Sequence, residues 1–506
     1  MSNKRQNREV RQFVASLHPG FKGANDENLA DWVTSPIDIN DVLRFDLWKL
    51  RARSRDMAMN DDTAKRFLNL LKQNVLGHMG IRLQMRNKKK NGKPDKALND
   101  SIETAWKSFC KKRRYRGQSA SPTACGSMSM REFQWLRLWM RIIDGETFTQ
   151  ILRGYPHNKQ RFAMRLINPD LLDTGYCATE KESRNGNRID MGIEFDEFDR
   201  PVAYHFSKLT NSGTISKRSQ DRIRIPADQI IHDFRHEYVG QIRGIPDFAC
   251  VMPKQKMLHG VHEAIVIGWR VAAAKMGFFT VNDPEAGFDT GKYDEFGNMV
   301  IDAVPGSFEA LPPGVDIKDF SQEYPTSTYE SGHKVFMQQL ANGLNISSPT
   351  LANNYEGVNY SSLRQAMLTD RDAFQCLQAE MEDNGYQPIF DEWYDWNVNV
   401  MGTVRIPESK RDIEPESEWQ ARGWPWVDPL KEVNAQKVAV DEKFRTRQSV
   451  IAETSGADFA DTAEQLSEEE EILKMHGLAT ANKMDPSKPN DQESDESEEK
   501  DQDEDE

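Results

Sequence analysis

Cysteine is scarce in this sequence, with five residues among 506, and none of them lies in a Cys-x-x-Cys pair. Scattered free thiols in odd number are typical of a protein from a reducing compartment, without a disulfide framework. No run of 18 uncharged apolar residues is present, which argues against a transmembrane helix. The first residues, MSNKRQNREVRQF, carry charges without an apolar core after them, so we expect no signal peptide.

Motifs for catalysis and cofactor binding are missing as well. We find no nucleotide-binding loop, no Gly-x-Ser-x-Gly and no His-Glu-x-x-His. His232 and His236 are four residues apart, a spacing that suits a metal only on a helix, and the local pattern predicts a strand followed by a loop. We therefore expect no catalytic residue, no metal and no cofactor, and we predict that the protein is not an enzyme.

Negative charge is concentrated at the C-terminus. The formal net charge is −14, and residues 485–506 alone hold twelve acidic residues and two lysines. The remainder of the chain is therefore close to neutral. A tail of this composition, from residue 479 onward, is expected to be disordered. It either solubilises the chain end, or it repels DNA or engages basic partners.

Positive charge is concentrated in residues 81–116, where thirteen Lys and Arg stand against three acids. Such a density suits phosphate contacts. The alternative is a basic loop followed by a solvated helix end, because no stacking aromatic residues are interleaved with the loop. The predicted basic patch consists of the following residues: Lys88, Lys89, Lys90, Lys111, Lys112, Arg113 and Arg114.

The stretch from Lys254 to Met276 has no proline and is predicted to be one long helix. Small residues recur along it every four positions and form one stripe: Gly260, Ala264, Gly268 and Ala272. Each glycine inside a helix costs about 1 kcal/mol against alanine, and close packing of another element is the compensation we expect. Three interpretations compete: a membrane span, which charged residues interrupt; a buried core helix; and a helix packed against copies of itself in a ring. Periodicity does not separate the last two.

Other helices are expected on both sides of this central one. The patterns predict helices over 41–60, 61–80, 131–152, 328–344, 362–384 and 430–456, and a short acidic helix near 468–477. The helix over 362–384 is expected to break at Gly385 and Pro388. Period-two segments between 161 and 234 predict strands, with a hairpin over 192–206 that turns at Asp196–Arg200. Residues 280–327 are read as a small β-containing insertion, and 346–362 as a polar loop.

Three segments resemble the lambda-type portal proteins of tailed bacteriophages. They are GIEFDEFDRPVAYHF (192–206), PADQIIHDFRHEYVGQIRGIP (226–246) and LANNYEGVNYSSLRQA (351–366), and WPWVDPLKEVNAQ (424–436) is also similar. The resemblance spans roughly residues 40–478, and the acidic tail departs from it. It implies a mixed α+β, multidomain portal fold, mainly α-helical in its stem and crown, with β-strands in its wing and clip.

The resemblance also implies how the chain divides. The implied parts are an N-terminal arm (1–40), a wing (41–253), a stem helix (254–279), a clip (280–327), a second stem helix (328–345), a tunnel loop (346–362), a long wing helix with a tryptophan-rich segment (363–424), a crown (425–478) and the acidic tail (479–506). About twelve copies would form a ring at one capsid vertex. DNA would be packaged and ejected through the ring.

Partners and location follow from the same resemblance. It implies self-association, double-stranded DNA in the channel, the terminase large subunit, head-tail connector proteins, and major capsid and scaffold proteins, without a membrane. The chain would belong to the virion at the portal vertex, and to the host cytoplasm during assembly.

The tunnel loop contains the candidate DNA contacts. They are hydrogen-bonding residues with little fixed positive charge, which suits DNA that must slide: Asn353, Asn354, Tyr355, Asn359 and Tyr360. The alternative is that Tyr355 and Tyr360 only pack the loop against the wing. A second function stays open at this point, a DNA-binding protein or DNA-processing enzyme that uses the basic patch in residues 81–116.

Overall fold

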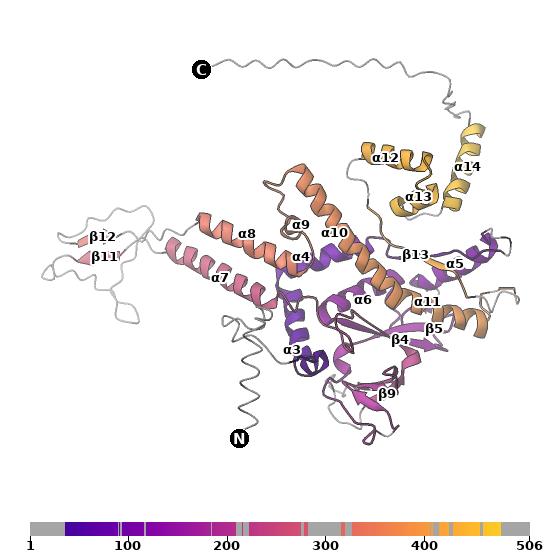
Figure 1. The fold of residues 1–506 in the computed structure, drawn as a ribbon, viewed down its shortest axis with the longest axis horizontal. Coiled ribbons are helices and arrows are strands. Elements are labelled where there is room, and N and C mark those ends of the chain that lie inside the picture. The colour runs from indigo at the N-terminus through magenta and orange to yellow at the C-terminus, as the bar shows by residue number, and fades with distance from the viewer. Residues whose placement is uncertain are drawn as a thin grey trace, which may run out of the picture. The chain divides into compact units, whose positions relative to one another are not determined.

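The structure is a computed structural model, which divides the chain into two compact units, Met1–Arg422 and Gly423–Glu506 (Figure 1). It describes residues 36–89, 91, 94–115, 118–183, 185–208, 215, 222–274, 278–281, 315–318, 326–404, 406–407, 414–424, 429–455 and 459–476. Helices and small sheets both occur, so the mixed α+β class is confirmed. Most of the expected N-terminal arm, most of the expected clip and the acidic tail lie outside the described residues.

The N-terminal part of the first unit is helical. Its helices are α3 (Ile39–Asn60), α4 (Asp62–Leu71), the π-helix η2 (Lys72–Leu76), α5 (Lys96–Cys110) and α6 (Met130–Asp144). Side chains before α3, α4 and α6 accept hydrogen bonds from otherwise free backbone amides. Asp61 caps α4, and Ser129 forms a capping box with Glu132 at the start of α6.

The predicted helix over 131–152 is wrong in its second half. Helix α6 ends at Asp144, and β4 (Glu146–Arg153) follows at once. Gly145 between them has a φ of 82°, which is favourable for glycine. A Cβ on Gly145 would come within 2.4 Å of the Ile245 carbonyl carbon. The helix therefore stops because a distant backbone segment packs directly against the turn.

Strand β4 is the centre of a three-stranded antiparallel sheet in the order β10-β4-β5. Its partners are β5 (Phe162–Ile167) and β10 (Ile230–Phe234). Its first six residues are buried, which explains why a simple alternation is absent from their sequence. Two short 3-10 helices, η3 (Pro169–Leu171) and η5 (Ala227–Gln229), lie in the connections of this region.

A four-stranded antiparallel meander lies next along the chain. It contains β6 (Arg188–Asp190), β7 (Ile193–Phe195), β8 (Pro201–Ser207) and β9 (Arg222–Pro226). The predicted hairpin over 192–206 is confirmed, because β7 pairs with β8 and the Asp196 amide donates to the Arg200 carbonyl at 3.0 Å. Two further pairs are β1 (Arg82–Met85) with β13 (Ser417–Gln420) and β2 (Arg113–Tyr115) with β3 (Gln118–Ala120).

Two long helices, α7 (Met252–Ala274) and α8 (Thr326–Gly343), run side by side (Figure 1). The thiol of Cys250, just before α7, donates to the carbonyl of Gly343 at 3.3 Å, and the rings of His262 and His333 stack at 5.1 Å. The first contact joins the start of α7 to the end of α8 and the second joins their middle turns, so the pair is antiparallel. Of the intervening module, β11 (Phe278–Val281) and β12 (Val315–Lys318) pair with each other.

The predicted helix break at Gly385 and Pro388 is wrong. Helical structure continues through α10 (Tyr360–Met381), the π-helix η6 (Glu382–Tyr386), α11 (Gln387–Tyr394) and the π-helix η7 (Asp395–Val400). Pro388 stands in the first turn of α11, after the wider π-turn. A Cβ on Gly385 would come within 1.8 Å of the Arg137 guanidinium, so glycine is needed here for packing.

The second unit contains α12 (Pro429–Asp441), α13 (Arg447–Ser455) and α14 (Phe459–Met475). The single helix predicted over 430–456 is therefore wrong. The amide of Phe444 donates to the Ala439 carbonyl at 2.9 Å, and Lys443 has a φ of 64°, which closes α12 before α13 begins. The predicted acidic helix is confirmed and extends over all of α14.

An aromatic core holds α5 and α11 together in the first unit. Trp106 lies 5.0 Å from Trp393 and 5.5 Å from Phe390, both in edge-to-face arrangements. Such ring pairs contribute beyond their buried area. The indole of Trp393 donates to the Gln160 side chain at 2.9 Å, so its one polar group is satisfied inside this core.

A buried carboxylate, that of Glu146 on β4, connects the sheet to its surroundings. Arg243 donates to both of its oxygens, with distances from 2.6 to 3.0 Å, and Arg51 of α3 donates to Oε1. The ring nitrogen Nε2 of His232 lies 3.1 Å from Oε2, and the Gly244 amide donates to the same oxygen at 3.0 Å. Both arginines and Glu146 are almost fully buried.

Burial and charge act in opposite directions on this site. Burial alone would raise the pKa of the Glu146 carboxyl, but the charges of Arg243 and Arg51 and the hydrogen bond to His232 hold it well below its usual value. Burial also lowers the pKa of His232, although Glu146 favours its charged form. The folded chain therefore prefers an ionised Glu146 and a neutral His232.

We predict that Glu146→Gln destabilises the protein by about 3–5 kcal/mol, because two buried guanidinium groups lose their counter-charge. Urea unfolding at neutral pH measures this difference. The matched control is Glu197→Gln in the exposed β7–β8 turn, which should stay within about 0.5 kcal/mol of the parent. Equal effects of the two substitutions would contradict a stabilising role for the Glu146 network.

We predict that His232 makes the protein less stable as the pH falls below about 6.5, its usual pKa. Because the pKa is lower in the folded chain, the unfolded chain binds the proton first, and stability is lost on acidification. The free energy of unfolding, measured from neutral pH toward pH 5, should fall more steeply for the parent than for His232→Gln. His157→Gln, at an exposed histidine, should follow the parent. Parallel curves for the parent and His232→Gln would show the prediction to be wrong.

Candidate functional site

The predicted tunnel loop, residues 346–362, is more structured than its sequence indicated. It contains the short helix α9 (Ser348–Ala352), and Ser347 before α9 is held by Asp370 of α10. The Ser347 amide and hydroxyl donate to the two Asp370 oxygens at 2.6 and 2.7 Å. Asp370 is buried, so the start of this loop is tied to α10.

The three candidate asparagines shape the loop. Asn353 ends α9 in the left-handed conformation and accepts a hydrogen bond from Arg66 at 3.2 Å. The side chain of Asn354 accepts from the Glu356 amide at 3.0 Å, and that of Asn359 caps α10 through the Ser362 amide at 2.8 Å. All three are exposed, but their side-chain oxygens already have partners within the chain.

The two candidate tyrosines differ from the asparagines. Tyr355 is 45% exposed and Tyr360 is 61% exposed, so a large part of each side chain is open to solvent in the single chain. Glu356 is the only charged residue in 346–362. The loop therefore presents two aromatic rings with hydroxyl groups and almost no fixed charge.

The first two residues of the small-residue stripe, Gly260 and Ala264, face away from α8. Leu258 is buried, and His262 stacks on His333 of α8. Gly260 and Ala264 stand two positions from them, which is about 200° around a helix. Both are exposed, and a Cβ on Gly260 would meet no atom within 4 Å. The side chain of Ala272 lies outside the described residues, and Gly268 is half-buried.

Large apolar side chains on α7 are also open to solvent. Exposed fractions run from 42% to 67% for the following residues: Met257, Val261, Val266, Ile267 and Trp269. By contrast, Val251, Met252 and Leu258 at the start of the helix are buried. The base of α7 is thus anchored in the body, while its later turns expose apolar surface that a single chain leaves uncovered.

The predicted basic patch is divided in the structure. Lys88 pairs with Glu416 at 3.7 Å, and Arg86 pairs with Glu418. These acids come from a segment more than 300 residues away, and sequence counting within 81–116 did not include them. Lys89 is exposed, Lys90 lies outside the described residues, and the side chain of Arg114 is not described.

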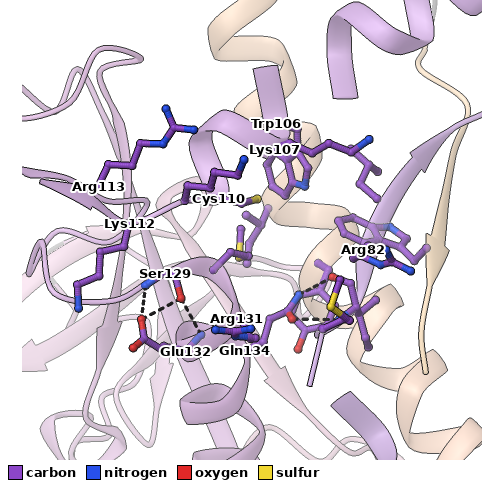
Figure 2. A pocket seen from close by; sticks show the side chains of 18 residues that line it. Arg82, Trp106, Lys107, Cys110, Lys112, Arg113, Ser129, Arg131, Glu132 and Gln134 are labelled. Atoms are coloured by element: carbon purple, nitrogen blue, oxygen red, sulfur yellow. Dashed lines mark hydrogen bonds between the residues drawn. The ribbon is translucent and has the colours of Figure 1, made fainter. Parts of the chain in front are cut away.

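The other basic residues surround a cavity of about 690 Å³ (Figure 2). Its lining includes Lys111, Lys112 and Arg113 from the predicted patch. It also includes Arg131 of α6, which sequence reasoning missed because it is remote from the basic segment. Lys88 and Lys89 are not among the lining residues. We call this cavity and its cations the basic pocket.

The two spaced histidines do not form a metal site. His232 is part of the Glu146 network, and His236 lies in the loop after β10, beside Phe234. Across the described residues, no group of three or more His, Cys, Asp or Glu is arranged to hold a metal. Among the described residues, no helix is both long enough and apolar enough to cross a membrane.

Two solved structures of gene transfer agent particles are similar to the chain. They are the neck of the empty particle, computed with C6 symmetry, and the neck of the native particle, computed with C12 symmetry. Each is 11% identical, with TM-scores of 0.43 and 0.42. The matches cover 84% and 81% of this chain, and 96% and 92% of the two structures. A likeness at this level adds no argument about this chain.

Sequence comparison is more informative. Residues 25–378 match the family model of the phage portal proteins of the lambda family. A probable portal protein of Halomonas phage phiHAP-1 is 32% identical over 450 residues, covering 87% of this chain and 83% of that protein. The chain therefore belongs to the lambda family of phage portal proteins.

Proposed function

We propose that copies of this chain form a closed ring at one capsid vertex, and that DNA enters and leaves the head through its centre. Membership in the portal family supports a structural role in the capsid, without enzymatic activity. That membership also sets aside the alternative of a DNA-processing enzyme. A ring is a head-to-tail assembly whose rotation closes, so each chain must offer two different contact faces.

One observation carries the proposal of a ring. The later turns of α7 expose large apolar side chains, and the opposite face from α8 carries small residues with open space above Gly260. Exposed apolar surface of this kind marks an interaction site. Small residues allow the neighbouring backbone to come close. Neighbouring copies of α7 and α8 would cover this surface in a ring.

With α7 as a contact between subunits, we assign the other parts of the chain to the ring. We assign residues 41–253 and 363–424 to the wing, and α7 and α8, within 254–279 and 328–345, to the stem. Residues 280–327 are assigned to the clip, 346–362 to the tunnel loop, 425–478 to the crown and 479–506 to the acidic tail. The antiparallel pairing of α7 and α8 supports a stem made of two helices that bracket the clip.

The exposed tyrosines refine the proposed channel contacts. Tyr355 and Tyr360 are offered as the DNA-facing groups, because their rings are open and their loop lacks positive charge. Asn353, Asn354 and Asn359 are offered as residues that hold the loop in shape, because each already has a partner. Hydrogen-bonding groups without cations suit DNA, because its phosphates must pass the loop without being held by it.

The partners in this proposal are those of a capsid vertex. They are other copies of the chain, double-stranded DNA, the terminase large subunit, head-tail connector proteins, and the major capsid and scaffold proteins. The proposed location is the virion, with assembly in the host cytoplasm.

A larger side chain on the stripe is predicted to prevent ring formation. In Gly260→Leu, leucine favours the helix by about 1 kcal/mol relative to glycine, and a Cβ at this position meets no atom of the chain, so α7 itself should not be weakened. The added side chain would instead separate neighbouring helices. Native mass spectrometry should show rings for the parent and mostly single chains for the variant.

The matched control for this experiment is Gly260→Ala. Alanine also favours the helix but keeps the stripe small, so this variant should form rings as the parent does. Rings in the leucine variant would show that the stripe is not a subunit contact. Single chains for the parent at every concentration would contradict the ring itself.

Removal of both exposed tyrosines is predicted to impair DNA packaging but not assembly. Tyr355→Ala/Tyr360→Ala should form normal rings, yet yield at least about threefold fewer DNA-filled heads, because contacts of about 1 kcal/mol are lost in every subunit. Nuclease-protected DNA per particle is the measurement. Tyr238→Ala, at a tyrosine that is 54% exposed outside the loop, is the control and should fill normally. Normal filling by the double variant would exclude the tyrosines as channel contacts.

A further inference from the structure

The floor of the basic pocket is apolar. It is lined by Ile81 and Leu83 beside and on β1, Trp106 of α5, Met130 of α6 and Ile389 of α11. These residues come from four distant parts of the sequence, and each is less than a tenth exposed. A cavity of about 690 Å³ is within the range of about 300–1,000 Å³ that ligand sites usually have. It has room for one or two large apolar side chains.

The cations stand at the rim of this floor. Figure 2 shows Arg82, Lys107, Lys112, Arg113 and Arg131 distributed around Trp106 and Cys110. All five cations are exposed, and Lys111 joins them at the cavity wall. Among the described lining residues, Glu132 is the only acid. The pocket therefore combines a strong positive rim with an apolar interior.

The polar groups inside the wall are already satisfied. Gln134 exchanges two hydrogen bonds with the backbone of Ile81, at 2.9 and 3.1 Å. Glu132 is held in its capping box by Ser129, whose hydrogen bonds lower the pKa of that carboxyl, with a further contribution from the charges of Lys112 and Arg131. Recognition of a polar ligand group therefore falls to the rim cations.

The aromatic residues in the floor do not offer a stacking platform. Of the three aromatic lining residues, Trp106 and Tyr386 are 4% and 2% exposed, and the half-buried Trp419 packs edge-to-face on Trp106 at 6.2 Å. Binding of single-stranded nucleic acid depends on open ring faces for base stacking. Aliphatic and thioether groups line the interior beside these packed rings, together with the half-buried Cys110, and such a lining suits an apolar side chain.

We propose that the basic pocket binds a short acidic segment of a partner protein that carries a bulky apolar side chain. The apolar side chain would enter the cavity, and flanking carboxylates would meet the rim cations. Charge complementarity and the apolar floor together select this occupant. The proposal concerns one chain alone and goes beyond the proposed ring, so failure of one leaves the other standing.

The test uses the full-length protein and a fluorescein-labelled peptide, Glu-Glu-Leu-Phe-Glu-Glu. We expect saturable binding, measured by fluorescence anisotropy, that is at least about tenfold tighter than that of Glu-Glu-Ser-Ser-Glu-Glu, because only the first peptide buries apolar side chains. Binding should also weaken as salt is raised, because exposed charges are screened. Equal binding of the two peptides, or none by either, would overturn the proposal without any substitution in the protein.

Charge reversal locates the site. Lys111→Glu/Lys112→Glu/Arg113→Glu should weaken binding of the apolar peptide at least about tenfold. The control Lys159→Glu/Lys181→Glu/Lys208→Glu changes net charge equally at exposed positions that do not line the pocket, and should stay within about threefold. Equal losses in both variants would overturn the site. A short oligothymidylate that binds more tightly than the peptide, and is lost in the pocket variant, would assign the pocket to nucleic acid instead.

Discussion

The charge of Glu146 is the constraint on which the body of the first unit depends. A carboxylate removed from water is costly unless charges and hydrogen-bond donors surround it in good geometry. Here Arg51, Arg243, His232 and the Gly244 amide do so, and they bring α3, β10 and the segment after β10 onto β4. That segment leads directly into α7. The buried charge therefore fixes the position of the segment from which α7 starts.

A second buried guanidinium anchors the helical tract that follows the tunnel loop. Arg137 of α6 donates to Asp233 at 3.0 Å and to the Asn384 carbonyl at 3.2 Å. It binds the π-helix η6 to the three-stranded sheet. Buried residues anchor the start of α7, the end of α8 and the end of α10. The later turns of α7 and the loop before α10 remain exposed. Buried contacts are concentrated where these helices join the body. Exposed surface is concentrated where we propose that neighbouring copies of the chain and DNA lie.

The elements that the sequence predicted correctly are those decided by local pattern. The α7 helix and the 192–206 hairpin follow from periodicity and turn residues close in sequence. Two of the errors have distant causes. Gly145 ends α6 because Ile245 packs on it, and Gly385 lies within a helix because Arg137 packs on it. The basic segment was visible as composition, but its partner acids near β13 and Arg131 of α6 come from elsewhere in the chain.

The distribution of charge separates two proposed tasks, the passage of DNA and the binding of a partner, which would conflict on one surface. Each cation that meets a phosphate adds affinity and slows the passage of DNA. Residues 346–362 contain no Lys or Arg, and none of them lines the basic pocket, where six cations gather over an apolar floor. A conduit needs the first arrangement, and a docking site for an acidic partner needs the second. In our proposal, a loop with no Lys or Arg of its own lets DNA pass, while the basic pocket holds a partner.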